Sequence, residues 1–540
     1  MADSFFSRAS RAKDLAAMAA ERVDLLIIGG GITGAGIARD AALRGLRVAL
    51  VERRDFASGT SSRSSKLIHG GVRYLRQGDI GLVLEAAEER RILRRIAPHL
   101  TQPRPMLIPA YGLGMHTKLN VGLWTYEKLA GIGADERHEM LGRQGALARE
   151  PGLRADGLHG AAVYPENVTD DARLVLATLQ SAKRSGGLIA NYAEVCALSL
   201  NGASSSVAVR DLEHSRVLQV RARIVINASG PWSDLVRALE APASRTLHLT
   251  KGIHFVVRRE DLPIHDMVVA QADDKRQIFA VPRGGIVYVG TTDTDYGAPA
   301  DYPEVTRHDV EYLISALRRV FPSLGWGAES VLSAWAGLRP LVHEPGKRPS
   351  EISRKHEIVI GPKGMISVAG GKLTTYRRMA EKVVDLAANR LGAAAESTTA
   401  HAMLEGGDLP AAPREYGEGL ASRFEPALPG LAQAVDRLVL HHGSGAEALL
   451  ERAVGAGTGF LPGRAALEVE VDHAVESEMA MHLCDVLERR LRLLLFTPDR
   501  GLGVTETVAD RMATLLGWDR RQRDREIAEY QRIAAASAPV

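Results

Sequence analysis

Residues 23–51 alternate between short apolar runs and a glycine-rich turn. Residues 23–29 have the pattern of a buried strand, residues 37–44 that of a helix ending at Gly45, and residues 46–51 that of a second apolar strand. Strand, turn, helix and strand in this order are typical of a βαβ unit in a doubly wound parallel sheet. The chain is therefore expected to begin with an α/β domain.

The middle of the chain mixes helical and strand patterns. Charged and apolar positions predict helices over residues 79–97 and 170–185, and an apolar strand over residues 220–228. Residues 251–295 alternate apolar and polar side chains between turn residues, which indicates an antiparallel sheet.

Helical patterns take over from about residue 401. Residues 465–496 carry apolar side chains at a spacing of three to four, which predicts one continuous helical face. A helical C-terminal domain is expected. The pattern leaves open whether this domain packs on the catalytic body, forms a homodimer or binds another partner.

The glycine-rich turn carries a dinucleotide-binding motif, Gly29-x-Gly31-x-x-Gly34, between the first strand and its helix. Glycines at these positions let the backbone turn tightly and approach a pyrophosphate, and the helix N-terminus attracts the phosphates. Glu52 ends the second strand, where a carboxylate can accept hydrogen bonds from a ribose 2′-OH. The arrangement fits FAD or NAD and disfavours NADP. The alternative, a purely structural turn, leaves Glu52 unexplained.

Two further segments favour FAD over NAD. A hydroxyl-rich stretch, residues 60–65, follows the acidic residue and precedes Lys66, where it can hold a flavin pyrophosphate and ring edge. Small residues around Gly230 end a later strand and allow close approach to a cofactor. Either segment alone is equally consistent with a solvated turn.

Composition excludes several classes of protein. Among 540 residues, hydrophobic types make up 45% and charged types 25%, which is the range of folded soluble domains. A net charge of +3 without a dense Lys/Arg block argues against nucleic acid as a partner. The two cysteines lie far apart and offer neither metal-ligand spacing nor a disulfide framework, so no metal is expected.

The N-terminal segment, residues 1–22, has no apolar core of the secretory type, and no apolar run in the chain reaches about 20 residues. Phe5, Phe6, Leu15 and Met18 lie among basic residues. Two interpretations stay open, an amphipathic helix lying on a membrane surface and a frayed terminal helix.

Several motifs together resemble the FAD-dependent glycerol-3-phosphate dehydrogenases. They are LLIIGGGITGAG (residues 25–36), SSKLIHGGVRYL (64–75), DDARL (170–174), GTTD (290–293), GLRPL (337–341) and GGKLTTYR (370–377). The second and the last are the most specific, and the resemblance runs from about residue 22 to residue 530, thinning after residue 400.

The resemblance implies an α/β fold with a Rossmann-like FAD-binding domain, an antiparallel-sheet substrate domain and a helical C-terminal cap. The expected limits are 23–100, 160–245 and 345–400 for the first, 101–159 and 246–344 for the second, and 401–540 for the cap. It also implies a peripheral enzyme on the cytoplasmic face of a membrane. Such an enzyme oxidises sn-glycerol 3-phosphate to dihydroxyacetone phosphate and passes electrons to a quinone.

Oxidation of a phosphorylated alcohol needs cations for the phosphate and a base for the hydroxyl proton. By resemblance, Arg339 and Arg354 bind the phosphate and Lys372 lies beside flavin and substrate. Each of these three could instead be structural: a buried ion pair for Arg339, solvated side chains for Arg354 and Lys372. His254 is the first candidate for the base, and a satisfied sheet histidine is its alternative.

His69 competes with His254 for the role of base and is otherwise a neighbour of the flavin. Arg73, Tyr74 and Thr291 are expected to contact the substrate. The residues expected to bind the cofactor are Gly29, Gly31, Gly34, Glu52, Thr60, Ser61, Ser62, Ser65, Lys66, Leu67, His69, Gly230, Gly371, Leu373 and Thr374.

Three other functions remain open from sequence. A glycerol-3-phosphate oxidase would use oxygen as the acceptor, and an amine or amino-acid oxidase of the same superfamily would need a carboxylate clamp. A non-catalytic flavin-binding or RNA-modifying scaffold would need a basic stripe, which the near-neutral charge does not support.

Overall fold

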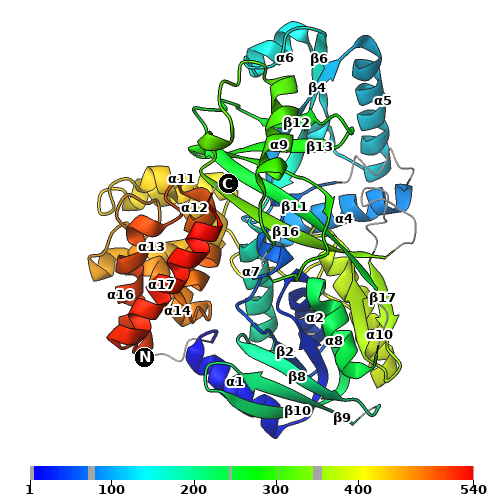
Figure 1. Ribbon diagram of the computed structural model, residues 1–540, viewed down its shortest axis with the longest axis vertical. Helices are drawn as coiled ribbons and strands as arrows, with labels where there is room; N and C mark the ends of the chain where they lie inside the picture. Colours follow the sequence, from blue (N-terminus) through cyan, green and yellow to red (C-terminus); the bar gives the residue numbers. More distant parts are fainter. Residues whose placement is uncertain are drawn as a thin grey trace.

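A computed structural model describes residues 5–70, 79–202, 204–242, 246–301, 303–343 and 356–538 of the chain. Two sheets lie one above the other along the long axis of the molecule, and a group of helices flanks them on one side (Figure 1). The arrangement confirms the expected fold class, with a Rossmann-like domain, an antiparallel-sheet domain and a helical C-terminal domain.

The first sheet has the strand order β17-β18-β10-β1-β2-β7, with β9 and β8 attached beyond β10. The pairs β18–β10, β10–β1, β1–β2 and β2–β7 are parallel. Its strands are β1 (Val23–Ile28), β2 (Val48–Val51), β7 (Leu188–Ala190), β8 (Ala193–Ser199), β9 (Ser205–Asp211), β10 (Arg216–Asn227), β17 (Glu357–Ile360) and β18 (Ile366–Ala369).

Helices α2 (Ile32–Leu43), α7 (Asp171–Arg184) and α10 (Tyr376–Leu391) pack against one another over this sheet. The strand–helix–strand order is the one predicted, although α2 begins at Ile32 rather than residue 37. The central strands β1 and β2 are mostly apolar, and their side chains enter separate core clusters on the two faces, as in other parallel sheets.

The second sheet is largely antiparallel, with the order β15-β11-β14-β13-β12-β4-β6-β3, and with β16 on β11 and β5 on β6. Its strands are β3 (Leu67–Ile68), β4 (Gln102–Tyr111), β5 (Glu139–Gly142), β6 (Leu158–Val168), β11 (Leu247–Arg258), β12 (Met267–Gln271), β13 (Gln277–Arg283), β14 (Ile286–Gly290), β15 (Thr294–Asp295) and β16 (Ser333–Val342). Strands β3 and β6 pair in this sheet, although the expected limits gave β3 and most of β6 to the flavin domain.

The remaining helices of the two sheet domains are α4 (Ile80–Ile96), α5 (Leu113–Ala130), α6 (Arg143–Arg149), α8 (Ser233–Glu240) and α9 (Arg307–Val320). Helices α4 and α5 share a small apolar cluster that includes Val83 and Tyr126. No helix within the described ranges is both long and apolar enough to cross a membrane.

The C-terminal helices form the cap. They are α11 (Pro413–Phe424), α12 (Leu431–His442), α13 (Ala446–Ala456), α14 (Glu468–Ser477), α15 (Leu493–Phe496), α16 (Thr505–Leu516) and α17 (Arg520–Ala536), with a π-helix at Asp485–Arg490.

The prediction of one continuous helical face over residues 465–496 was wrong. The segment breaks into α14, the π-helix and α15, and Met479 and Arg492 adopt positive φ angles between these pieces. All the apolar residues of the predicted face are buried. From Glu478 to Arg492 the carboxylates and guanidiniums between them are buried too, and most of them form ion pairs with the flavin domain. This half of the segment therefore lacks the solvent-facing charged side of an amphipathic helix.

Those ion pairs fasten the cap to the rest of the molecule. Asp55 accepts hydrogen bonds from Arg489 and Arg490 at 2.5 Å each, and Arg492 donates to Asp171 at 2.8 Å. These side chains are at most 6% exposed. The cap therefore packs on the catalytic body, which is one of the three options left open by the sequence.

The N-terminal helix α1 (Arg8–Ala20) is neither frayed nor open to a membrane. Phe6, Leu15 and Met18 are fully buried, and Arg11 pairs with Asp211 at 2.7 Å. Helix α1 packs on β7 and β10, so its apolar side chains complete the core of the first sheet.

Candidate active site

A cavity of about 400 Å³ opens where the parallel strands of the first sheet end. Residues directly after four neighbouring strands line it: Gly29 after β1, Glu52 after β2, Ala228 after β10 and Gly370 after β18. In open α/β sheets, ligands bind outside the carboxyl ends of the strands at such a position.

The predicted glycine motif builds one wall of this cavity. Gly29 has φ +115°, and a Cβ there would lie 2.6 Å from the carbonyl oxygen of Ala228. A Cβ on Gly34 would lie only 1.9 Å from the carbonyl oxygen of Gly29. Only glycine therefore fits these two positions, and α2 begins beside them with its N-terminus at the cavity.

Glu52 lies on the same wall and is half-buried. Its carboxylate accepts hydrogen bonds from the backbone N–H of Gly30 at 2.7 Å and of Arg54 at 2.8 Å. Burial raises its pKa, and the two backbone donors oppose that effect. The donors fix the carboxylate at the cavity edge, where each oxygen has a second lone pair for a ribose hydroxyl.

The far end of the cavity is formed by the segment after β18. Gly370 and Gly371 have φ angles of +72° and +91°, and Lys372 and Leu373 line the cavity. Thr374 is buried, and its hydroxyl donates to the carbonyl oxygen of His69 at 3.4 Å. The backbone thus approaches the cavity closely, as the motif at residues 370–377 predicts.

The hydroxyl-rich stretch belongs to a longer piece of chain, residues 55–69, which we call the flavin segment. Thr60, Ser61 and Ser64 line the cavity. The Ser61 hydroxyl accepts the backbone N–H of Ile32 at 3.0 Å, and the Thr60 hydroxyl donates to the carbonyl oxygen of Leu338 at 2.6 Å. The stretch therefore bridges the start of α2 and strand β16 along the cavity.

The four expected cofactor residues between Ser62 and Leu67 are not among the residues that line the cavity. The Lys66 ammonium is fully buried and lies 3.0 Å from both oxygens of Asp171. Burial and the neighbouring Arg492 lower the pKa of Lys66 to about 8, while Asp171 acts in the opposite direction. The other three are Ser62 and Leu67, which are buried, and Ser65, which contacts His254.

Strand pairing in the second sheet brings together three predicted residues, His254, Arg339 and Thr291. In the register of β11, His254 faces Gly290 of β14, and Thr250 faces Arg339 of β16. Two glycines make the room these side chains need. A Cβ on Gly290 would lie 2.0 Å from the His254 ring, and one on Gly252 would lie 2.3 Å from Arg339 Nη2.

Arg339 is held by two neighbours on the turn after β14. Its Nη2 donates to the Thr291 hydroxyl at 3.0 Å, and its Nη1 lies 3.2 Å from Asp293 Oδ1. Its chain neighbour Pro340 lines the cavity. The Arg339 side chain is itself absent from the cavity lining, so the cation lies beside the cavity rather than on its wall.

His254 is 2% exposed and stacks on Trp335, with ring centroids 5.0 Å apart and planes 9° apart. Its Nε2 lies 2.8 Å from the hydroxyl of Ser65. Burial lowers the pKa of His254 well below its usual value, and the charges of Lys66 and Arg339 lower it further. Both effects favour the neutral form of the ring over the charged one.

Arg73, Tyr74 and Arg354, three of the expected substrate residues, lie outside the described residues. The sequence analysis missed Asp293, Gly252, Gly290 and Asp171, which hold Arg339, His254 and Lys66 in place. Three of the four, Gly290, Asp293 and Asp171, stood in motifs already recognised, GTTD and DDARL. The two Gly roles become visible only once the strands are paired.

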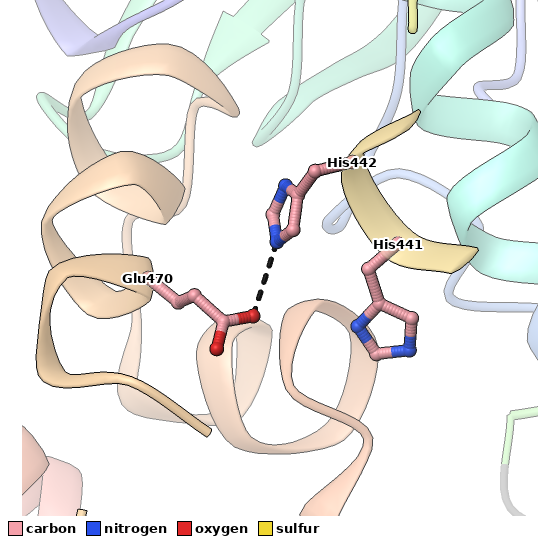
Figure 2. A group of neighbouring side chains, drawn as sticks. All are labelled: His441, His442 and Glu470. Carbon is pink, nitrogen blue, oxygen red and sulfur yellow. Dashed lines mark hydrogen bonds and ion pairs between the residues drawn. The ribbon is translucent and has the colours of Figure 1, made fainter. Parts of the chain in front are cut away.

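A second cluster of titratable groups lies in the cap. His442 Nε2 is 3.0 Å from Glu470 Oε1, and His441 stands beside them (Figure 2). Arg437 supplies the positive charge here, since it pairs with Glu470 and lies 3.1 Å from His441 Nδ1. Burial lowers the pKa of His442 to about 4, despite Glu470. Arg173 of α7 also lies 3.3 Å from His442 Nδ1, so the cluster is held by partners in the cap and in the flavin domain.

Comparison with known proteins identifies the family. A family model for FAD-dependent oxidoreductases matches residues 24–377, and a model described as the C-terminal domain of alpha-glycerophosphate oxidase matches residues 397–523. An aerobic glycerol-3-phosphate dehydrogenase of Staphylococcus haemolyticus is 40% identical over 522 residues, covering 93% of each chain. The chain belongs to the FAD-dependent glycerol-3-phosphate dehydrogenases.

Other members of this family agree over the full length. The Bacillus subtilis aerobic glycerol-3-phosphate dehydrogenase is 37% identical over 540 residues, covering 98% of this chain and 97% of its own. The structure of a Bacillus halodurans glycerol-3-phosphate dehydrogenase complexed with FAD matches with a TM-score of 0.81 at 34% identity, covering 98% of both chains. A glycine oxidase from Geobacillus kaustophilus shares the fold at 23% identity, with a TM-score of 0.53, over 68% of this chain and 95% of its own.

FAD is the cofactor of this family, and the described residues fit it. The glycine wall admits a pyrophosphate, Glu52 is held where a ribose would lie, and the backbone after β18 lines the same cavity. The prediction of FAD is confirmed.

Proposed function

We propose that this protein oxidises sn-glycerol 3-phosphate to dihydroxyacetone phosphate by hydride transfer to FAD and passes the electrons to a membrane quinone. Relatives named for this dehydrogenase align over almost the entire chain. The structural observation that carries the proposal is the convergence of Arg339 and His254 on neighbouring strands beside the cofactor cavity.

Arg339 is suited to bind the substrate's phosphate. The phosphate carries about −1.5 to −2 charges at neutral pH. A guanidinium is planar with several N–H donors, so it can hold phosphate oxygens while keeping Thr291 and Asp293 as partners. Those two partners fix the orientation of the guanidinium before substrate arrives, which reduces the cost of ordering it.

His254 is suited to receive the hydroxyl proton. FAD, when bound, supplies the acceptor for the hydride from C2. The proton of the C2 hydroxyl must leave in the same reaction, and a neutral imidazole can accept it. Part of the depression of the His254 pKa comes from Arg339. A phosphate bound there would offset that charge and raise the basicity of the ring.

The remaining site assignments belong to the same proposal. Lys372, on the cavity wall, would stabilise negative charge on the reduced flavin. Arg73, Tyr74 and Arg354 would complete the substrate site. The hydroxyl and backbone groups of the flavin segment would contact the cofactor.

Substitution of Arg339 tests the phosphate assignment. Arg339→Ala should leave FAD bound, and the concentration of glycerol 3-phosphate needed for flavin reduction should rise about 10- to 100-fold, from about 1.5–3 kcal/mol for hydrogen bonds to a charged group. Arg258→Ala is the control, because this arginine lies at the exposed end of the neighbouring strand β11. Unchanged anaerobic bleaching of the flavin in Arg339→Ala would refute the assignment.

The electron acceptor needs its own measurement. The family model that matches the C-terminal domain is described from alpha-glycerophosphate oxidase, so oxygen is the alternative electron acceptor to test. After anaerobic reduction by glycerol 3-phosphate, we expect a soluble quinone analogue to reoxidise the flavin much faster than air-saturated buffer. Stoichiometric hydrogen peroxide at a rate equal to that with quinone would instead identify an oxidase.

An exposed apolar surface on α5 supports attachment to a membrane. Val121 and Trp124 are 57% and 56% exposed, and Lys118 and Lys128 are exposed beside them. The one acidic residue of the helix, Glu127, is buried against His138. The neighbouring α4 adds further exposed apolar side chains, Ile80 and Leu84. Helix α5 thus presents an apolar face with exposed basic and no exposed acidic side chains, which suits an anionic lipid surface, while α4 carries the exposed Glu88.

Vesicle binding tests this attachment. The double variant Val121→Ser/Trp124→Ser should lose co-sedimentation with phosphatidylglycerol vesicles while its flavin is still reduced by glycerol 3-phosphate. Val454→Ser, an exposed apolar residue of the cap, serves as the control. If the double variant binds the vesicles as the unmodified protein does, α5 is not the membrane contact.

A further inference from the structure

The ring of His254 is closed off from the cofactor cavity. It is 2% exposed, one face stacks on Trp335, and its Nδ1 is buried with no hydrogen-bond partner among the described residues. Its other nitrogen, Nε2, faces the Ser65 hydroxyl at 2.8 Å. A substrate hydroxyl therefore cannot touch either ring nitrogen directly while this packing persists.

Ser65 provides the connection that the ring lacks. It is half-buried and follows Ser64, which lines the cofactor cavity. Its backbone is fixed on both sides, since its carbonyl oxygen accepts the Tyr288 hydroxyl at 3.2 Å and the next residue, Lys66, is anchored on Asp171. A serine hydroxyl has one proton to give and two lone pairs with which to accept.

We propose that Ser65 relays the proton of the substrate's C2 hydroxyl to His254. The proposal rests on the function proposed above. The substrate O–H bond breaks as its proton passes to the Ser65 oxygen, and the Ser65 O–H bond breaks as its proton passes to Nε2 of His254. Ser65 ends neutral and the imidazole becomes an imidazolium. The electron pair of the substrate O–H bond would become the second bond of the new carbonyl, and FAD, when bound, would supply the acceptor for the C2 hydride.

The local charges make such a relay workable. The step needs the tautomer of His254 with its proton on Nδ1, which leaves the Nε2 lone pair directed at Ser65. The imidazolium would form near the cations Lys66 and Arg339. Lys66 is already paired with Asp171, and the substrate's phosphate would balance Arg339. Bound phosphate would therefore raise the pKa of His254, whereas in the empty site Lys66 and Arg339 both lower it.

Single-turnover flavin reduction tests the relay. Under anaerobic conditions, Ser65→Ala should retain yellow FAD and half-saturate at a similar glycerol 3-phosphate concentration. Its limiting rate of flavin reduction should fall about 100- to 10,000-fold, the usual contribution of general base catalysis. Ser65→Thr keeps the hydroxyl and should stay within about tenfold of the unmodified rate. A Ser65→Ala rate within threefold of the unmodified rate would overturn the proposal.

A double-variant cycle separates a relay from two independent roles. Because the two groups act in series, Ser65→Ala/His254→Gln should be no slower than the slower single variant. If the rate loss of the double variant instead equals the product of the two single-variant losses, the relay is overturned. If Ser65→Ala fails to retain FAD, Ser65→Cys and Ser65→Thr carry the same comparison. If glycerol 3-phosphate does not bleach even the unmodified protein, the proposed function fails; if it bleaches that protein and Ser65→Ala equally fast, only the relay fails.

Discussion

His482 joins the cap to the first sheet and should make stability depend on pH. Its ring lies in the cap, with Nδ1 2.8 Å from Glu526 of α17 and Nε2 3.1 Å from Glu213 in the turn between β9 and β10. Burial alone would lower the pKa of His482, but the two carboxylates outweigh it and raise the pKa to about 11. A charged histidine thus holds the cap against the first sheet.

The sign and size follow from linkage. A folded-state pKa raised from 6.5 to about 11 gives stability that is complete below pH 6.5 and is lost as pH rises towards 11. One pH unit in this window corresponds to about 1.4 kcal/mol. Between pH 6.5 and 8 the loss is therefore about 2 kcal/mol at most, since the side chain is 29% exposed and partly screened. Above pH 8 the depressed pKa of Lys66 acts in the opposite direction, so the measurement stops there.

The assay compares urea unfolding of the unmodified protein and His482→Gln at pH 6.5 and 8. The gap in unfolding free energy should shrink by about 1–2 kcal/mol across this interval, because only the unmodified protein loses the charged histidine's contribution. The difference in unfolding free energy between the two proteins cancels the contribution of every group that titrates alike in both. His214→Gln is the control, because His214 lies one residue from Glu213 but is 47% exposed. An equal gap at both pH values would refute the reasoning.

Two further predictions concern the contacts around the flavin segment. Arg492→Met removes one of the cations that pair with the buried Asp170 and Asp171, so it should lower the unfolding free energy by about 3 kcal/mol. Arg414→Met, the control, breaks an exposed pair in the same cap and should cost under about 1 kcal/mol. Equal losses for the two variants in urea unfolding would contradict this prediction. Gly290→Ala should retain FAD but abolish flavin reduction by glycerol 3-phosphate, because the new Cβ would collide with the His254 ring. Normal reduction kinetics in this variant would show that the ring has room to move.

Much of the fold was predictable because local patterns determined it. The glycine motif, the strand before it and the acid after it form one continuous stretch, so their geometry follows from short-range sterics. The helices at residues 79–97 and 170–185 and the strand at 220–228 appeared within a few residues of their expected limits. These elements have one apolar stripe or face and common end signals.

The failures share a physical cause, which is burial by distant partners. The pattern over residues 465–496 satisfied a helical period, but its charged residues pair with Asp55, Asp170 and Asp171, hundreds of residues away. The basic residues of α1 likewise suggested a surface helix, yet Arg11 pairs with Asp211 in the core. A sequence lists charges, but only tertiary contacts show whether a charge faces water or a buried partner.

The flavin segment makes contact with all three parts of the molecule, and this has a thermodynamic consequence. Asp55 binds the cap arginines, Thr60 binds strand β16, and Ser65 contacts His254 of the second sheet. A ligand that binds the flavin segment only in its ordered form must therefore stabilise the cap interface and the substrate strands together. The stabilising free energy grows with the logarithm of the ligand concentration divided by its dissociation constant. Removal of FAD should consequently weaken cap docking as well as catalysis, although FAD itself would lie in the first domain. In this protein, cofactor affinity, cap packing and the placement of His254 are coupled through one stretch of chain.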